Sequence, residues 1–148
     1  MPFEPFRVAA AVYGILHDQG RILLVRRSGT GYRDGQLSLP AGHLDGGEDA
    51  VTGLVRELRE ELGIEADPAS CRLALVMHSA PEDSDDWEYL NLFFTVNRWA
   101  GEPSNAEPDK CSELRWTDRS ALPPDIVDYV AEALSAIERG EPLALRGW

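Results

Sequence analysis

The sequence lacks most of the features that would set it apart from an ordinary globular protein. Its two cysteines, Cys71 and Cys111, form no Cys-x-x-Cys pair, so neither a disulfide framework nor a zinc site is predicted. Both are expected to be reduced structural thiols. No apolar run approaches the roughly 20 residues of a membrane helix, and the N-terminus has no signal-peptide pattern. We therefore expect a cytoplasmic protein that contacts no membrane.

Positive charge is also scarce. The 148 residues include 14 Lys and Arg against 26 Asp and Glu, which gives a net charge of −12. Nucleic acid is an unexpected partner, because polyanions are bound by clustered cations. A small phosphorylated ligand would need local positive charge from arginine or metal. The length, without repeats or linkers, predicts one domain over residues 1–148.

Apolar periodicity and turn residues divide the chain into strands and helices. Helices are predicted at 49–62 and 125–139, where apolar residues recur every three or four positions. The acidic loop 82–86 is expected to be solvated or to act as a substrate-side lid, and the tail 140–148 to dock or to stay mobile. The predicted strands are residues 7–16, 21–27, 36–39, 71–77, 87–99 and 113–117. This pattern indicates an α/β protein with a mixed sheet.

The predicted helix 49–62 carries an apolar stripe and a separate acidic stripe. Glu57, Glu60 and Glu61 form the acidic stripe, which spans about 100° by helical geometry. A solvated acidic face is the ordinary explanation for such a cluster. However, like charges at these spacings repel, and the dipole disfavours anions near a helix C-terminus. A divalent cation would convert the repulsion into coordination and would bridge to substrate phosphates.

A glycine-rich segment, residues 39–48, precedes this helix and permits close approach of a ligand to the main chain. It matches neither of the common glycine-rich nucleotide-binding motifs. Segment and helix together resemble the Nudix box, G-x5-E-x7-R-E-U-x-E-E-x-G-U with U aliphatic, at every specified position. The matching residues are Gly42, Glu48, Arg56, Glu57, Leu58, Glu60, Glu61, Gly63 and Ile64. The resemblance implies a Nudix-type α/β/α sandwich with a mixed central sheet and the box as a loop and helix.

The resemblance also implies a magnesium-dependent hydrolase that acts on phosphoanhydride bonds. Two box residues, Glu48 and Arg56, would orient the metal ligands. An ordinary surface ion pair is the alternative role for Arg56. The implied ligands of Mg²⁺, for which Mn²⁺ would substitute, are the carbonyl of Gly42 and the carboxylates of Glu57, Glu60 and Glu61.

The general base stays open, because Nudix enzymes use either a box glutamate or one from a later loop. Glu61 is the first choice. Glu107 is the second, since it follows a Trp-x-Gly-Glu-Pro stretch similar to that of MutT-type relatives, which carry an additional catalytic glutamate there. A solvated loop carboxylate is the alternative for Glu107. Glu57 and Glu60 complete the expected catalytic set.

Beyond the box, residues 40–44 and 107–116 are similar to MutT-like nucleoside triphosphate diphosphatases. Those enzymes release a nucleoside monophosphate and pyrophosphate, often from damaged or modified nucleotides. Arg27 matches a phosphate-contacting arginine of that subgroup, with an exposed strand end as the alternative. Leu39 and Tyr89 are candidates for the apolar slot that would hold a base.

Two other functions stay open at this point. One is a pyrophosphatase for nucleoside diphosphate derivatives, such as ADP-ribose, a dinucleotide or a nucleotide sugar, which yields two monophosphates. The other is a Nudix module that binds a nucleotide without turning it over. The complete set of glutamates argues against this module, because idle clustered carboxylates only cost stability. A homodimer is a further open alternative, common among relatives, although no exposed apolar stripe predicts one.

Overall fold

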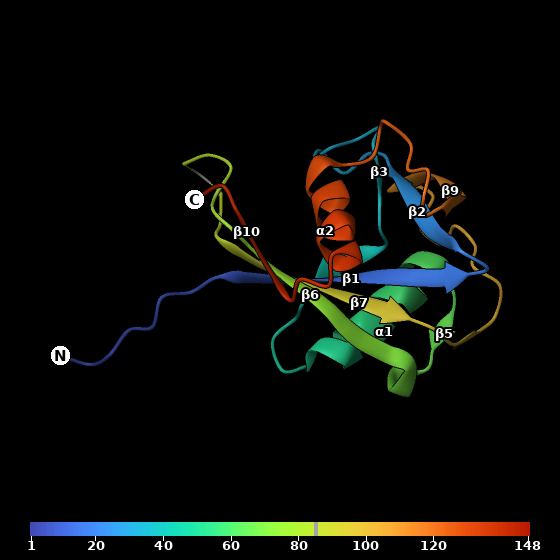
Figure 1. Ribbon diagram of the computed structural model, residues 1–148. Coiled ribbons are helices and arrows are strands. Elements are labelled where there is room, and N and C mark those ends of the chain that lie inside the picture. The colour runs from blue at the N-terminus through green and yellow to red at the C-terminus, as the bar shows by residue number, and fades with distance from the viewer. Residues whose placement is uncertain (85) are drawn as a thin grey trace.

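The computed structural model describes residues 1–84 and 86–148. A sheet lies between two helices, with α1 (Ala50–Leu62) on one face and α2 (Asp128–Glu138) on the other (Figure 1). The family resemblance predicted this α/β/α arrangement, and the prediction is confirmed.

In the described part of the chain, the main sheet has eight strands and a second sheet has two. The strands are β1 (Ala9–Asp18), β2 (Arg21–Arg27), β3 (Leu37–Ser38), β4 (Ala41–His43), β5 (Glu65–Ala66), β6 (Cys71–Ser79), β7 (Tyr89–Val96), β8 (Trp99–Ala100), β9 (Cys111–Asp118) and β10 (Leu143–Arg146). One turn of 3-10 helix, η1 (Pro68–Ser70), precedes β6. The main sheet has the order β10-β6-β7-β1-β2-β3, with β4 paired to β1 and β9 paired to β2. The sheet is mixed, because β1 and β7 run parallel, as do β10 and β6, among antiparallel pairs.

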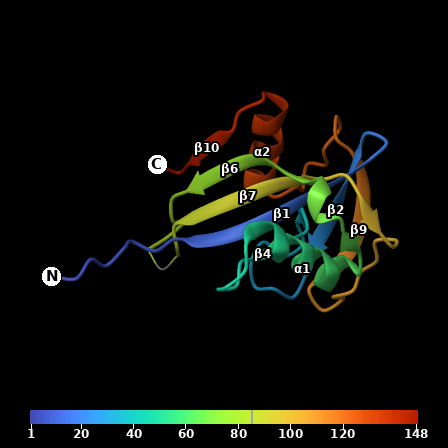
Figure 2. The same ribbon diagram turned by 90° about the horizontal axis from the view of Figure 1, so that it is seen from below.

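Strand β1 runs through the middle of the sheet, beside β7 (Figure 2). Tyr13 and Ile15 belong to the core under α2, whereas Val12 and Leu16 belong to the core under α1. Burial on both faces explains why successive residues of this strand are apolar. Gly14 lies on the α1 side, where an added Cβ would stand 3.2 Å from Leu58 Cδ2, so the missing side chain lets the helix approach closely.

The predicted helix 49–62 agrees with α1 to within one residue, because the residues that begin and end this helix are adjacent to it in the sequence. Asp49 caps the helix by accepting a hydrogen bond of 2.9 Å from the N–H of Thr52. Gly63 ends it in the left-handed region, with φ of 67°, and donates its N–H to the carbonyl of Arg59. The apolar stripe is buried as expected, at Leu54, Val55, Leu58 and Leu62.

Several sequence predictions of element bounds were wrong, among them the following three. The second helix begins at Asp128 rather than 125, because residues 125–127 are tied to Leu37 by two backbone hydrogen bonds of 3.0 and 2.8 Å. The predicted strand 87–99 is divided into β7 and β8. The first strand continues to Asp18, and the turn follows at residues 19–20.

The tail 140–148 docks on the sheet. Residues 143–146 form β10, which pairs in parallel with β6. The short apolar run of the tail carries too little periodicity to predict a strand, and the pairing supplies the partner that the local sequence does not show.

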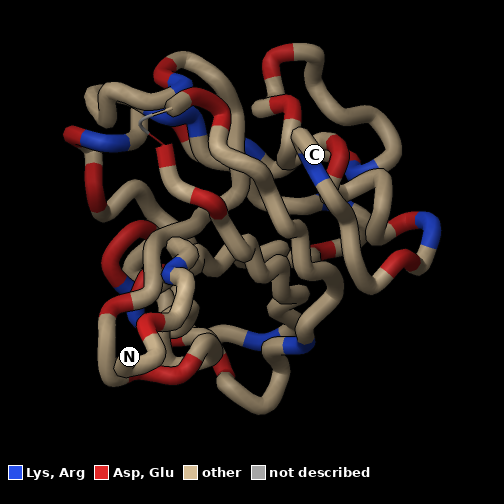
Figure 3. The backbone as a smooth tube through the Cα atoms, turned by 90° about the vertical axis from the view of Figure 1, so that its left-hand side faces the viewer, with Lys and Arg blue, Asp and Glu red and all other residues tan. Residues whose placement is uncertain are grey.

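Acidic residues lie on turns and loops around much of the molecule (Figure 3). Over residues 1–84 and 86–148, no helix is long and apolar enough to cross a membrane.

Packing of α1 on β1 can be tested at Leu58, which is fully buried. We expect Leu58→Ala to lower the free energy of unfolding by about 2–5 kcal/mol, because it leaves a cavity above Gly14. Urea denaturation would measure the loss. Leu145→Ala is the control, because Leu145 is 66% exposed and its truncation should cost less than about 0.5 kcal/mol. Equal losses in the two variants would contradict the packing described.

Candidate active site

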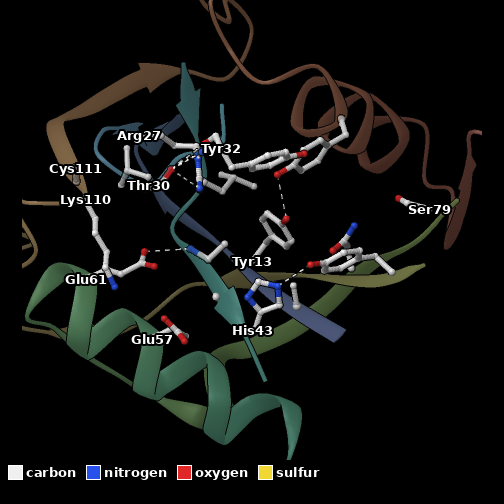
Figure 4. A pocket seen from close by; sticks show the side chains of 18 of the residues that line it. Tyr13, Arg27, Thr30, Tyr32, His43, Glu57, Glu61, Ser79, Lys110 and Cys111 are labelled. Carbon is white, nitrogen blue, oxygen red and sulfur yellow. Dashed lines mark hydrogen bonds between the residues drawn. The ribbon is translucent and has the colours of Figure 1, made fainter. Parts of the chain in front are cut away.

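A cavity of about 760 Å³ opens between α1 and the N-terminal end of α2, across the faces of β1, β4 and β7. One end, the acidic end, is lined by Glu57, Glu60, Glu61 and Glu107. The other end, the tyrosine end, is lined by Tyr13, Tyr32, Tyr89 and Tyr129. Figure 4 shows Glu57 and Glu61 projecting from α1, with Tyr13 and Tyr32 farther toward α2. The structure thus brings together carboxylates from the predicted box and aromatic side chains from distant segments.

Glu61 is the most strongly perturbed acid of the cavity. Burial, together with the negative charges of Glu57 and Glu107, raises its pKa to about 8. Its Oε2 accepts a hydrogen bond of 3.2 Å from the N–H of Ala41, which orients the carboxyl group toward β4. Burial also raises the pKa of Glu57. Two desolvated carboxylates that repel one another therefore stand at the same end of the cavity.

Gly42 allows this arrangement, because its missing Cβ leaves room for Glu57. A Cβ built on Gly42 would lie 2.0 Å from Glu57 Cδ, so the Glu57 carboxylate could not keep its position beside any larger residue. The backbone conformation of Gly42 is open to other residues, since its φ is not in the left-handed region. The sequence pointed to Gly42 through its carbonyl, whereas the structure adds a steric reason for glycine.

Arg56 holds the acidic end in place through a fork of ion pairs. Its guanidinium contacts both oxygens of Glu48 at 3.0 and 2.7 Å, and Glu57 at 2.9 Å. It also donates to the carbonyl of His43 at 3.2 Å and approaches Glu60 at 3.4 Å. These contacts join the loop, β4 and α1, so they favour an orienting role over an isolated surface pair.

The acidic end fits a hard divalent cation in its chemistry. In the described ranges, no three Asp, Glu, His or Cys side chains converge closely enough to enclose an ion by themselves. Mg²⁺ usually keeps several waters and binds through one or two carboxylates together with substrate phosphates. Glu57 and Glu61 repel one another, and the Glu57 carboxylate packs on the backbone of Gly42. Two carboxylates placed in this way fit a cation that takes its remaining ligands from water and substrate.

Two cationic residues, Arg27 and Lys110, also line the cavity near this end. Arg27, at the end of β2, donates to the carbonyl of Tyr32 at 2.7 Å and to Oγ1 of Thr30 at 3.1 Å. Among the described residues it forms no contact ion pair, although its charge lowers the pKa of Asp34. Lys110, the only lysine of the sequence, contacts Glu107 at 3.3 Å. Glu107 therefore lies on the cavity wall and is more than a solvated loop carboxylate.

The two residues predicted to hold a base lie in different environments. Leu39 is 1% exposed and belongs to the core beneath the cavity wall. Tyr89 is half-buried, and its hydroxyl lies 2.9 Å from Nε2 of His43 (Figure 4). His43, at the end of β4, also lines the cavity. Leu39 therefore contributes apolar wall, and Tyr89 contributes a ring with a polar tip.

Several residues of the tyrosine end were missed in the sequence. Tyr13 of β1 donates its hydroxyl to that of Tyr129 of α2 at 3.3 Å, across 116 residues of chain. Burial raises the pKa of Tyr13, so the hydroxyl stays protonated. Asn91 of β7 also lines the cavity. No local signal identifies such residues, because only the packing of α2 on the sheet brings them together.

At the mouth of the cavity, Glu82 of the predicted acidic loop contacts the loop that follows β2. It accepts from the hydroxyl of Tyr32 at 3.0 Å and from Arg33 at 2.8 Å. Asp85, within the same predicted loop, lies outside the described residues. The contacts of Glu82 connect two loops on the tyrosine side of the cavity.

Comparison with known proteins finds similarity over most of the chain. A family model of the NUDIX domain matches residues 5–136. An 8-oxo-dGTP diphosphatase from Haemophilus influenzae is 31% identical over 122 residues, which cover 78% of each chain. An ADP-ribose pyrophosphatase from Methanocaldococcus jannaschii is 28% identical over 121 residues, or 82% of this chain and 68% of that protein. The crystal structure of a MutT NUDIX hydrolase from Burkholderia pseudomallei has a TM-score of 0.79 and 25% identity, and covers 88% of this chain and 98% of that one.

The raised pKa of Glu61 predicts a pH-dependent stability without added metal. Since the pKa is raised from 4.5 to about 8 on folding, the folded protein binds the proton more tightly than the unfolded chain does. The free energy of unfolding should therefore fall as pH rises through this window. Above pH 8, in a chelator, we expect Glu61→Gln to raise the melting temperature by roughly 5 °C, and to have little effect near pH 4.5. An equal rise in Glu60→Gln, where the carboxylate is half exposed, would contradict this explanation.

Gly42→Ala tests the close approach of Glu57 to β4. The new Cβ would force the carboxylate away, so we expect affinity for Mg²⁺, measured by calorimetry, to fall by about tenfold or more. Circular dichroism should show a retained fold, because the Glu57 side chain can move. Gly46→Ala is the matched control in the same segment, where an added Cβ meets nothing within 4 Å. A similar loss of affinity in both variants would contradict the steric argument.

Proposed function

This chain belongs to the Nudix family and hydrolyses pyrophosphate bonds, and on that premise we propose that its substrate is a nucleoside triphosphate. The proposed products are a nucleoside monophosphate and pyrophosphate, and the proposed cofactor is Mg²⁺, with Mn²⁺ as a substitute. Damaged or modified nucleotides fall within this proposal, since the Haemophilus influenzae relative is an 8-oxo-dGTP diphosphatase.

A single observation carries the proposal: one cavity joins the acidic end to the tyrosine end. Its volume of about 760 Å³ lies within the range of small-molecule sites. A triphosphate at the acidic end would leave the sugar and base pointing toward Tyr13, Tyr89 and Tyr129. Aromatic side chains with polar tips are suited to hold a base, because their faces are apolar and their hydroxyls form hydrogen bonds.

The chain's own residues supply positioning, charge and a proton acceptor. Glu57 and Glu61 would hold the cation, with Arg56 fixing Glu57. When bound, Mg²⁺ neutralises phosphate charge and lowers the pKa of water. Arg27 and Lys110 would contact phosphate oxygens, because both cations line the cavity.

We propose Glu61 as the general base that takes a proton from the attacking water. Its carboxyl group is oriented by the N–H of Ala41 and stands at the acidic end, where the cation and the phosphates would lie. Glu107 lies on the same cavity wall and is the second candidate for this role. In-line attack of water on phosphorus needs no covalent intermediate on the enzyme.

A second candidate function is supported by the relative from Methanocaldococcus jannaschii, which is an ADP-ribose pyrophosphatase. In that case the substrate would be a nucleoside diphosphate derivative, and both products would be monophosphates. Product analysis separates the two functions, because only triphosphate cleavage of the proposed kind releases pyrophosphate.

The proposal predicts the products and a strong effect of one substitution. With Mg²⁺ and a panel of nucleoside triphosphates, ADP-ribose, nucleotide sugars and dinucleotides, we expect pyrophosphate and a monophosphate from at least one triphosphate, identified by mass. Glu61→Gln should lower kcat by about 100-fold or more, because it removes a ligand and the proposed base. Glu138→Gln, on the exposed face of α2, should keep full activity.

Each other outcome has a definite meaning. Monophosphate pairs from ADP-ribose, with triphosphates left intact, would replace the proposal with the second candidate function. Retained activity in Glu61→Gln together with loss in Glu107→Gln would move the proposed base to Glu107. Binding of nucleotides without any product would contradict both functions.

A further inference from the structure

Asn91 is a buried polar residue that the proposed chemistry leaves unused. It lies in the middle of β7, between Ala11 of β1 and Met77 of β6, and is 6% exposed. Its side-chain Oδ1 has no hydrogen-bond partner among the described residues. A carbonyl oxygen buried in this way is destabilising unless a group from outside the chain pairs with it. Asn91 also lines the cavity, so such a group has a route to it.

The surroundings of Asn91 are otherwise apolar or aromatic. Tyr89 and Phe93 flank it at two residues on either side, which places all three side chains on the same face of β7. Phe93 is stacked under Tyr13, with ring centroids 4.5 Å apart. Ala11, directly opposite on β1, is too small to cover the amide. One amide in an aromatic wall is the usual composition of a site that both holds and reads a flat ligand.

We propose that Asn91 is a specificity-determining residue that reads the hydrogen-bonding edge of the substrate's base. The inference rests on the proposed function, because it assumes a base at the tyrosine end. A side-chain amide has an acceptor next to a donor, so it matches a base edge that carries an N–H beside an acceptor. The unpaired Oδ1 of Asn91 is the atom that accepts the N–H. A site with a committed acceptor rejects a base that lacks the donor, since the acceptor is then left unpaired.

Purine riboside triphosphate is the matched probe, because its base carries ring acceptors and no N–H. We would compare its kcat/KM with the values for adenosine and guanosine triphosphates. In the wild type we expect at least one donor-bearing base to be preferred by about 10-fold to 200-fold. Asn91→Leu and Asn91→Ala should each reduce this preference to about threefold or less. The second variant guards against misfolding of the first, because alanine adds no bulk beside Met77.

Thr117→Val is the matched control for removal of an unpaired polar atom. Thr117 is also buried, its Oγ1 also lacks a partner in the described chain, and it does not line the cavity. Both Asn91→Leu and Thr117→Val should raise the melting temperature by roughly 2–4 °C without ligand, since each removes an unsatisfied group. Only the Asn91 variants should lose the preference among bases.

Failure of this inference is distinguishable from failure of the proposed function. Dissociation constants of the corresponding nucleoside monophosphates report base recognition without any turnover. If no triphosphate releases pyrophosphate, the proposed function fails. The ratio of the dissociation constants, for monophosphates with and without an N–H donor on the base, still tests whether Asn91 reads the base. A wild-type ratio near one, or a ratio unchanged in both Asn91 variants, would overturn the inference. A ratio unchanged in both variants would mean that ordered water, rather than the base, is the hydrogen-bond partner of Asn91 Oδ1.

Discussion

Repulsion between desolvated carboxylates is the constraint on which the rest of the site depends. Glu57 and Glu61 stand at one end of the cavity, where burial and neighbouring negative charges favour the neutral form of each. Such an arrangement is unstable unless other groups fix the positions of the carboxylates. The holding groups are the Arg56 fork, the Ala41 N–H and the close packing of Glu57 against Gly42. The helix itself is held by Leu54 and Leu58, which pack on Gly14 of β1. The free energy gained by packing this helix in the core offsets the repulsion between the carboxylates.

The parallel pairing of β1 with β7 determines what the carboxylates face. It places Tyr13 beside Phe93 and Ala11 beside Asn91, on the side of the sheet that α2 covers. Since β4 pairs with the same strand, the box loop begins next to that aromatic surface. The cavity therefore joins two kinds of chemistry, because one central strand contributes to both.

The sequence predicted the parts of the molecule that depend on local signals. The apolar periodicity and the glutamate spacing are both contained within residues 42–64, so helix, loop and site carboxylates were identified together. The tyrosine end was largely missed, because Tyr13 and Tyr129 meet only through the tertiary fold. Lys110 and His43 gave no distinctive pattern, and their location depends on loop and strand placement. Strand β10 required a partner, β6, that the sequence of the tail does not reveal.

A chain with a net charge of −12 must still attract a polyphosphate, and the distribution of its arginines shows how it can. Arg146 lines the cavity and Arg33 lies at its border, but each forms ion pairs with two carboxylates. Arg33 pairs with Glu82 and Asp128. Arg146 pairs with Asp128 and Glu132. Their charge is largely neutralised, so they stabilise the loops around the mouth. Arg27 differs, because its two hydrogen bonds go to neutral oxygens. Its charge is therefore less fully compensated than theirs, although it also acts on the carboxylates of Asp34 and Glu61. Together with a divalent cation at Glu57 and Glu61, this one arginine would make the potential locally positive, whereas the outer surface stays acidic and repels longer polyanions.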